Sequence, residues 1–417
     1  MLYSSALLAA LLLSMALPPA RVYGFVFRAD ERGSIAPNAG MSFSRDQSRR
    51  RSTLTETLAS VVPPRELKSM QVSLQQDPST AISWETLPND VDPFSTTWRS
   101  HPPNQSGGQP TVRGERKRAQ IQNFYQLLLP LIDTLASRAE TESPVTVVDF
   151  GSGSGNLVLP LASLFPQCAF VAVDYKEKAL ALLKIRAEKS GLVNLKVVPP
   201  CLIQSYSGPC DVALSLHGCG SATDFVIELA LERGVPYLAS PCCVGKVNGR
   251  GRGRKGATKA LLAVRTSTDS NSGKHAVSKP GQVQAQRMVQ SFDESFVAVE
   301  NDVFHEDGQL VRPRSRWLRG QLSMNQYSDI AIAADRSEVT ESQEAGYHNL
   351  ESDFCNSDMS PAAKSRFCKI LVELDRNEHA VEVGNYRAFI AQMHSLESYA
   401  KKDVLVGLPP GVILGGF

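Results

Sequence analysis

The chain has 417 residues, of which 42% are hydrophobic and 21% are charged, and its formal net charge is +2. This hydrophobic content is enough for a substantial core, which excludes a chain without a folded domain. The length allows two or three average domains or one α/β domain with attachments, and the near-neutral net charge hides local differences, so it says little about partners.

Residues 1–24 are predicted to be a secretory signal peptide. The run from Ala6 to Leu17 is apolar but too short to span a bilayer comfortably, and Pro18, Pro19 and small residues follow it. A membrane anchor is the alternative.

Residues 25–60 form a second targeting segment. They include a stretch rich in Arg and Ser and poor in acids between Ser42 and Ser52, as in organelle transit peptides. With Phe25 directly after the expected cleavage point, the pair resembles the bipartite presequences of algae with secondary plastids. We therefore predict import into a plastid, with no stable membrane insertion after processing, and plain secretion as the alternative.

The eight cysteines speak against plain secretion. They lie in apolar or strand-like contexts, and Cys242 and Cys243 are adjacent. Disulfide frameworks occur mainly in small secreted domains that lack a sufficient core. A reducing compartment fits this pattern better.

Residues 61–113 are rich in Pro, Ser, Gln and Asn and are predicted to be an extended lead-in. From Gly114 to Ala139 the apolar residues recur at helical spacing. The basic start of this helix, Arg116 to Arg118, has the wrong sign for a helix N-terminus. It indicates a ligand or partner there, or else a solvated basic turn.

Residues 145 to 240 alternate regularly between strand and helix patterns. Alternation at this spacing predicts a parallel, doubly wound sheet, in which ligands bind at the carboxyl ends of the strands. The expected strands are 145–150, 168–173, 194–198, 211–215 and 235–240, and the expected helices are 155–165, 176–190 and 221–233.

A glycine-rich turn follows the first of these strands. The spacing D-x-G-x-G-x-G begins at Asp149, and a second acid, Asp174, ends the next strand. Dinucleotide sites instead use G-x-G-x-x-G, which seats a pyrophosphate on a helix N-terminus. An acid before the glycines and an acid after the next strand suit an uncharged ribose and a cationic methionine, so we predict S-adenosylmethionine as the cofactor.

Residues 245–295 interrupt the alternation with a basic insertion that we expect to be flexible. Seven Lys and Arg residues from Lys246 to Arg265 occur among glycines with no acid between them. Such an Arg/Gly tract is typical of nucleic-acid contact, although a solvated insertion has the same composition. The predicted RNA contacts are Arg250, Arg252, Arg254 and Lys255.

Three motifs together carry a family resemblance. They are Asp149 to Gly155, the run His217-Gly218-Cys219-Gly220-Ser221-Ala222-Thr223-Asp224, and Ser240-Pro241-Cys242-Cys243-Val244-Gly245. They resemble the methyltransferase domain of the glutathione S-transferase C-terminal domain-containing protein, over roughly residues 80 to 410. The His-x-Cys-Gly-x-Ala-Thr-Asp element also looks like a tRNA ribose 2′-O-methyltransferase family.

The resemblance implies a Rossmann-like class I methyltransferase with a seven-stranded, mainly parallel sheet, in one domain over residues 114–412. Its last two strands are expected at 386–393 and 403–408, after a helix at 361–382. The region before residue 80 is too short for a glutathione-transferase-like domain, so glutathione chemistry is not implied. Cofactor contacts are expected from Asp149, Gly151, Ser152, Gly153, Gly155, Asn156, Asp174, Tyr175, Cys201 and Leu202.

The loop after the fourth expected strand is the candidate catalytic region. His217 and Asp224 flank it, and His is the usual base near neutral pH, although His217 can equally hydrogen-bond a loop carbonyl. Cys219, Ser240, Cys242 and Cys243 are the expected substrate pocket. These cysteines and His217 have the chemistry of zinc ligands, which leaves a metal site as the alternative. We predict no metal there, because structural zinc sites usually pair cysteines two to four residues apart and adjacent cysteines seldom bind one ion.

The function predicted is a methyltransferase that acts on RNA, with tRNA as the first choice. A protein or small-molecule acceptor is one alternative. A non-catalytic scaffold that binds S-adenosylmethionine is another, because the glycine turn and its two acids are expected in either case. The sequence leaves the oligomeric state open.

Overall fold

The computed structural model describes residues 53–93, 112–138, 143–245, 310–335, 354, 359–396 and 402–415. The signal peptide, most of the transit-like segment and all but the first residue of the basic insertion lie outside these residues. The predictions about targeting and about Arg250, Arg252, Arg254 and Lys255 therefore stay predictions. Within the described part, no helix is both long and apolar enough to cross a membrane.

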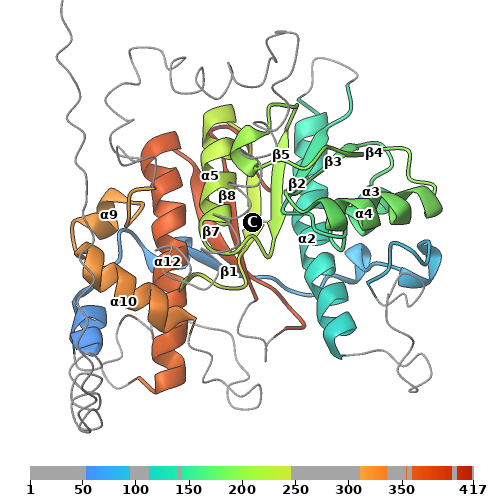
Figure 1. The fold of residues 1–417 in the computed structure, drawn as a ribbon. Helices are drawn as coiled ribbons and strands as arrows, with labels where there is room; N and C mark the ends of the chain where they lie inside the picture. Colours follow the sequence, from blue (N-terminus) through green and yellow to red (C-terminus); the bar gives the residue numbers. More distant parts are fainter. Residues whose placement is uncertain are drawn as a thin grey trace, which may run out of the picture. The chain divides into compact units, whose positions relative to one another are not determined.

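The described residues fold around one sheet of eight strands, in the order β1-β7-β8-β6-β5-β2-β3-β4 (Figure 1). All neighbouring strands pair in parallel except β8, which is antiparallel to both β6 and β7. The strands are β1 (Gln71–Ser73), β2 (Thr146–Phe150), β3 (Ala169–Val173), β4 (Leu195–Val197), β5 (Val212–Leu216), β6 (Tyr237–Ser240), β7 (Arg387–Gln392) and β8 (Asp403–Leu408).

Helices cover both faces of the sheet. The α-helices are α2 (Val112–Ala136), α3 (Val158–Leu164), α4 (Glu177–Lys189), α5 (Ser221–Arg233), α9 (Arg316–Arg319), α10 (Met324–Ala334) and α12 (Pro361–Gly384), and residues 53–60 are also helical. Short 3₁₀ turns lie at η1 (Leu67–Ser69), η2 (Pro78–Thr80), η3 (Trp84–Thr86) and η4 (Ile203–Ser205).

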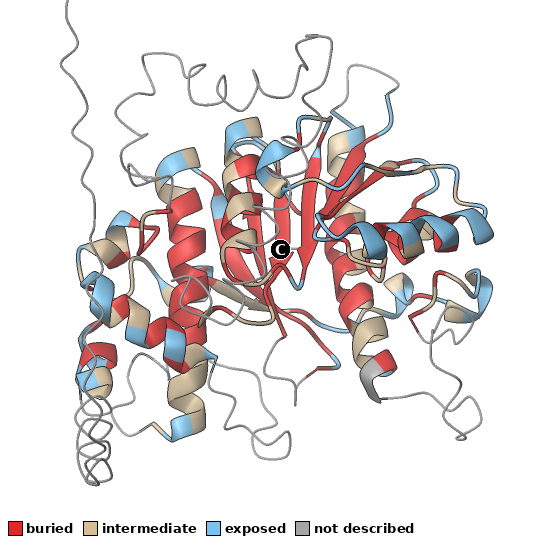
Figure 2. Ribbon diagram, viewed as in Figure 1, coloured by how far each residue is buried: buried red, intermediate tan, exposed pale blue. Residues whose placement is uncertain are grey.

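The strand residues alternate between two apolar clusters, as the period of two requires. Val147 and Leu214 pack with α2, α3 and α4 on one face, whereas Val148 and Ala213 pack with α5 and part of α12 on the other. Strands buried on both faces are expected to be apolar throughout. Figure 2 shows the central strands buried along their length, which explains the unbroken apolar runs in the sequence.

The expected doubly wound sheet and the class I strand order are confirmed. The antiparallel strand β8 lies between β6 and β7, as predicted. Each strand predicted between residues 145 and 240 is observed, with ends that differ by two residues at most.

The lead-in adds an eighth strand that the sequence does not predict. β1 pairs in parallel with β7, Gln71 opposite Ile390, at the outer edge of the sheet. Further along, Asp92 pairs with Arg118, whose guanidinium lies 4.9 Å from the centre of the Trp84 ring. The basic start of α2 therefore has a partner within the chain, and the alternative of a solvated basic turn is wrong for Arg118.

Residues 53–60 differ from the predicted organisation, which assigned them to the transit-like segment. They form a helix, and Leu58 is buried in an apolar cluster with residues of α10 and α12. An apolar side chain in that position stabilises the fold by removing its surface from water. This part of the segment thus belongs to the folded unit.

α12 is buried over most of its length although it carries many charges (Figure 2). Lys369 donates to Glu373, one turn along the helix, and to Asp403 at the start of β8. Asp375 accepts the backbone N–H groups of Arg314 and Ser315, each at 2.8 Å. Buried charges require such partners, so these pairs fix α12 against β8 and against the segment before α9.

Candidate active site

The glycine turn after β2 has the conformation that the sequence pattern requires. Gly151, Gly153 and Gly155 all have positive φ angles, of 77°, 55° and 87°, in the left-handed region that residues with a Cβ rarely adopt. The N–H groups of Gly151 and Ser152 both donate to the carbonyl of Val173, which joins the turn to the end of β3.

Two of these glycines border open space and the third does not. A Cβ on Gly151 would meet no atom within 4 Å, and one on Gly153 only the Gly151 carbonyl at 4.0 Å. A Cβ on Gly155 would lie 2.8 Å from Leu159 Cδ1 and 2.9 Å from Leu183 Cγ. Gly155 therefore serves close packing of α3 and α4, whereas Gly151 and Gly153 leave a cradle for a ligand.

Asp149 is the last residue but one of β2 and is buried beside this turn. Its Oδ2 atom is buried and has no hydrogen-bond partner among the described residues. Burial and the charge of Asp174 raise the pKa of Asp149 to about 8, and the hydrogen bond from the Val158 N–H offsets only part of this increase. A buried carboxylate with an open acceptor atom favours a cation or a donor group nearby.

Asp174 lies across the turn at the end of β3. Its Oδ2 accepts the N–H of Gly153 at 2.9 Å and its Oδ1 accepts the N–H of Lys176 at 2.8 Å. Each carboxylate oxygen can accept a second hydrogen bond, so both remain able to bind hydroxyl groups. Asn156, which follows the turn, has a buried Oδ1 that meets no hydrogen-bond partner in the described part of the chain.

The remaining predicted cofactor residues border the same region. Tyr175 follows Asp174 with 51% of its surface exposed, and Leu202 is 38% exposed. Cys201 donates its backbone N–H to the carbonyl of Asp174, which ties the loop after β4 to the end of β3. Exposed aromatic and apolar side chains beside a polar cradle are suited to the face of a base.

The loop after β5 carries His217 in a left-handed conformation, with φ 68°. The side chain is exposed, and the backbone N–H donates to the carbonyl of Ser240, a buried residue at the end of β6, at 2.9 Å. A non-glycine residue in this region stores about 1–3 kcal/mol of strain, which is found mostly at functional sites. The role of His217 as a base stays a prediction.

Asp224 does not have the catalytic role predicted for it. It lies in α5, 1% exposed, and its carboxylate pairs with the guanidinium groups of Arg312 and Arg376. Burial alone would raise the pKa of Asp224, but the two guanidinium groups outweigh burial and lower it. A carboxylate held in this way cannot take up a proton near neutral pH, so Asp224 is a structural ion-pair partner.

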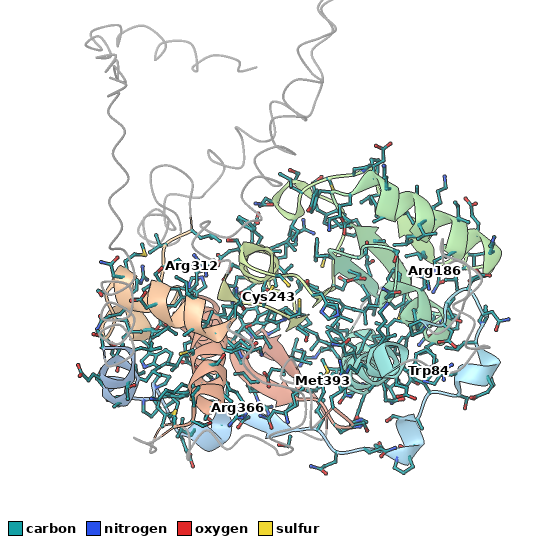
Figure 3. The ribbon with its side chains drawn as sticks, turned by 60° about the horizontal axis from the view of Figure 1, so that its bottom comes forward. Trp84, Arg186, Cys243, Arg312, Arg366 and Met393 are labelled. Atoms are coloured by element: carbon teal, nitrogen blue, oxygen red, sulfur yellow. The ribbon has the colours of Figure 1, made fainter. Side chains whose placement is uncertain are left out.

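The three predicted pocket cysteines do come together. The sulfur atoms of Cys219, Cys242 and Cys243 all lie within 4.8 Å of one another, and each residue is partly buried. Figure 3 labels Cys243, on the loop that follows β6. Contact with the Cys242 and Cys243 side chains lowers the pKa of Cys219.

Some residues that shape this edge of the sheet escape sequence reasoning. Arg186 of α4 is buried and donates to the carbonyls of Ser154 and Asp90, so it joins the lead-in to the glycine turn (Figure 3). Arg312 and Arg376 hold Asp224 from positions 88 and 152 residues away. Each of the three lies in a segment with no motif, so the sequence carries no local signal for these contacts.

Comparison with known proteins agrees with this geometry. Residues 116–250 match a family model described as a methyltransferase domain. This part of the chain is therefore similar to a methyltransferase domain. Together with the strand order, the match confirms the class I fold that the glycine turn and the two acids predict.

The chain has relatives among larger proteins. It is 31% identical over 168 residues to the glutathione S-transferase C-terminal domain-containing protein of Xenopus laevis, a match that covers 40% of this chain and 24% of that protein. The homologue from Drosophila pseudoobscura pseudoobscura is 27% identical over 243 residues, which cover 58% of this chain and 34% of that protein. The chain thus spans about a quarter to a third of the length of these relatives.

A third relative has a name that states its substrate. Ribosomal RNA small subunit methyltransferase G of Lactococcus lactis subsp. lactis (strain IL1403) is 27% identical over 88 residues, covering 21% of this chain and 35% of that protein. The shared part is short.

The residues present fit the cofactor of such a domain. S-adenosylmethionine has a ribose with two hydroxyl groups, a sulfonium and an ammonium group. Asp174 offers acceptors for hydroxyl groups, and the open Oδ2 of Asp149 offers an acceptor in a region of negative charge. The negative charge of Asp174 beside the turn would repel a pyrophosphate, so the site suits a cationic methionine derivative better than a dinucleotide.

Proposed function

We propose that the protein transfers a methyl group from S-adenosylmethionine to RNA, with tRNA as the first RNA to test. The cofactor part rests on the open glycine cradle between Asp149 and Asp174. The RNA part rests on where the Arg/Gly tract starts. Gly245 follows the loop after β6, at the carboxyl edge that carries the cradle, and the basic residues begin at the next position.

Methyl transfer requires the protein mainly to position the two reactants. The cofactor supplies a methyl group on a sulfonium that is already activated, so orientation and exclusion of water can provide most of the acceleration. Asp149 and Asp174 would hold and orient the bound nucleoside. His217, exposed on the loop after β5, would accept the proton of a hydroxyl or amino acceptor.

The ribosomal RNA methyltransferase in the comparison adds weak support for an RNA acceptor, because it matches only 88 residues. The local likeness of the His217 to Asp224 element to tRNA ribose methyltransferases points in the same direction. A protein or a small molecule as acceptor, and a scaffold without catalysis, are outcomes of the experiment that follows.

The test is salt-dependent RNA binding together with transfer of a labelled methyl group to unmodified tRNA. In one variant Arg250, Arg252, Arg254 and Lys255 become Gln, and in the matched control four exposed lysines elsewhere, Lys178, Lys184, Lys189 and Lys196, become Gln. Each phosphate contact contributes about −0.7 to the slope of log K against log salt for single strands and about −0.9 for duplex.

We expect the tract variant to bind RNA more weakly and to lose about 3 from that slope, while the control variant keeps both. Cofactor binding should stay unchanged in each. Wild-type protein that binds the cofactor but neither binds nor methylates RNA would contradict the RNA proposal and favour another acceptor. RNA binding without methyl transfer in the wild type would favour the scaffold.

A further inference from the structure

Cys219, Cys242 and Cys243 form a cluster of thiols on the loops that follow β5 and β6, which we call the thiol cluster. Their sulfur atoms lie within 4.8 Å of one another, and Cys219 Sγ is 2.7 Å from Cys242 Sγ. Other described cysteines, such as Cys168, Cys210 and Cys368, are buried singly in the apolar core. The cluster thus differs from cysteines that only fill space.

Adjacency of Cys242 and Cys243 does not prevent both from facing Cys219. Adjacent side chains of a strand point to opposite faces of the sheet. β6, however, ends at Ser240, and the chain bends at Cys242. Both sulfur atoms therefore reach the same side, which removes the main reason for predicting that no metal binds here.

The two loops are held in place by contacts outside the cluster. The N–H of Gly220 donates to the carbonyl of Cys243 at 3.3 Å, and that of Val244 donates to Asp335 at 2.8 Å. Arg376 donates to the carbonyl of Gly220 at 2.8 Å. A set of ligands fixed by surrounding hydrogen bonds is characteristic of built metal sites.

The spread of the three sulfur atoms is compatible with one metal ion. Zinc takes thiolates at about 2.3 Å, which places them about 3.8 Å apart around a tetrahedral ion, and the three sulfur atoms lie within 4.8 Å of one another. Cys219 and Cys242, whose sulfur atoms lie 2.7 Å apart, would separate by about 1 Å on binding. Three soft thiolates select zinc or copper(I) over calcium or magnesium.

We propose that Cys219, Cys242 and Cys243 bind one zinc ion. Three protein ligands leave a fourth coordination position, which in such sites is taken by water or by a substrate atom. The cluster is partly exposed at the same sheet edge as the cofactor cradle, so an acceptor atom can take that position. The proposal does not depend on RNA being the acceptor.

The test measures metal directly in the full-length protein. Protein purified under reducing conditions from zinc-supplemented medium should contain about one zinc ion per chain by mass spectrometry of the metal. Titration of metal-free protein with cobalt should give thiolate charge-transfer bands, which report sulfur ligands independently of any activity.

Cys219→Ser, Cys242→Ser and Cys243→Ser should each lower the zinc content at least about tenfold at limiting free zinc and weaken the cobalt bands. Cys201→Ser, a partly buried cysteine outside the cluster, is the matched control and should keep both. Thermal melts of the variants check that they fold. Wild-type protein without zinc and without cobalt charge-transfer bands, or with a Cys219–Cys242 disulfide in the unreduced protein, would overturn the proposal.

Discussion

Two polar regions at the carboxyl edge of the sheet differ in how their charges are satisfied. Around Asp149 the buried acceptors are incompletely paired and two glycines border open space. Around Asp224 the carboxylate meets two guanidinium groups on both oxygens. Since an unpaired buried acceptor is costly unless something binds it, we assign the first region to ligand binding and the second to structure.

The largest loss of stability is expected from removing the carboxylate of Asp224. Asp224→Ala leaves the guanidinium groups of Arg312 and Arg376 buried without their partner and should lower the free energy of unfolding by about 3–5 kcal/mol. Arg316→Ala is the control, because this side chain is 67% exposed where it pairs with Glu382, and it should change stability by less than about 1 kcal/mol. Urea denaturation checks both, and equal losses would contradict a structural role specific to Asp224.

The ion pairs of Asp224 with Arg312 and Arg376 also predict how stability changes with pH. The folded-state pKa of Asp224 is lowered, so the stability it contributes is complete above the unfolded pKa of about 3.9 and disappears as pH falls below it. Denaturation curves at pH 7 and pH 5 should show the same loss for Asp224→Ala. A loss that appears only above pH 6 would be inconsistent with this assignment.

Within the glycine turn, two substitutions separate packing from binding. Gly155→Ala puts a methyl group against Leu159 and Leu183 and should destabilise the fold by about 2–4 kcal/mol, from overpacking and left-handed strain together. The new methyl group of Gly151→Ala meets no neighbour, so this variant should lower stability by only about 1–2 kcal/mol. It should nevertheless reduce cofactor affinity more than Gly155→Ala does. Thermal melts and calorimetric titration measure the two effects, and the reverse order would refute the division.

The raised pKa of Asp149 makes cofactor affinity depend on pH. A carboxyl group with a pKa of about 8 in the free protein must lose its proton before it can attract a cation, so affinity should rise by up to about tenfold per pH unit below pH 8. The contribution of Asp149 to folding stability changes with pH in the opposite direction. A raised pKa stabilises the free protein fully below the unfolded pKa of about 3.9, and this contribution is lost as pH rises to about 8.

Asp149→Asn is the variant that isolates the contribution of Asp149 ionisation to the pH dependence of cofactor affinity. It retains the shape of the side chain but cannot ionise, so the remaining pH dependence belongs to the cofactor and to other groups. Calorimetric titrations between pH 6 and pH 9 give the comparison. If wild type and variant have parallel profiles, Asp149 does not change its protonation on binding.

The smallest expected effect concerns His217. Glycine tolerates a φ of 68°, so His217→Gly should leave stability unchanged or raise it by up to about 1 kcal/mol, whereas His217→Ala keeps the strain. If His217 is the base, both variants lose methyl transfer and retain cofactor binding. Transfer activity that survives in both variants would leave His217 with only a loop role.

Local signals allowed much of the fold to be predicted. The strands from β2 to β6 follow from apolar runs of strand length between glycine turns, and these depend only on neighbouring residues. β7 and β8 followed from the family resemblance. β1 escaped because three residues in a polar lead-in carry no alternation, and only pairing with β7, more than three hundred positions away, makes them a strand.

Site residues that lie in local motifs could be predicted, and roles that depend on distant contacts could not. The cofactor residues lie in one motif and in the residues after the next two strands, so their positions could be inferred from the order of the sheet. The role predicted for Asp224 was wrong, because it depends on Arg312 and Arg376, which are distant in sequence. The closeness of Cys219 to Cys242 and Cys243 depends in the same way on β5 lying beside β6.

Calorimetric titration of S-adenosylmethionine into wild type and Asp174→Ala tests the central claim most directly. The carboxylate of Asp174 orders the turn through Gly153 and provides the expected ribose acceptors. Loss of even one charge-assisted hydrogen bond, worth about 1.5–3 kcal/mol, should weaken binding by about 10- to 150-fold. Arg316→Ala should bind like the wild type. A wild type that does not bind S-adenosylmethionine, or an Asp174→Ala variant with unchanged affinity, would contradict the account.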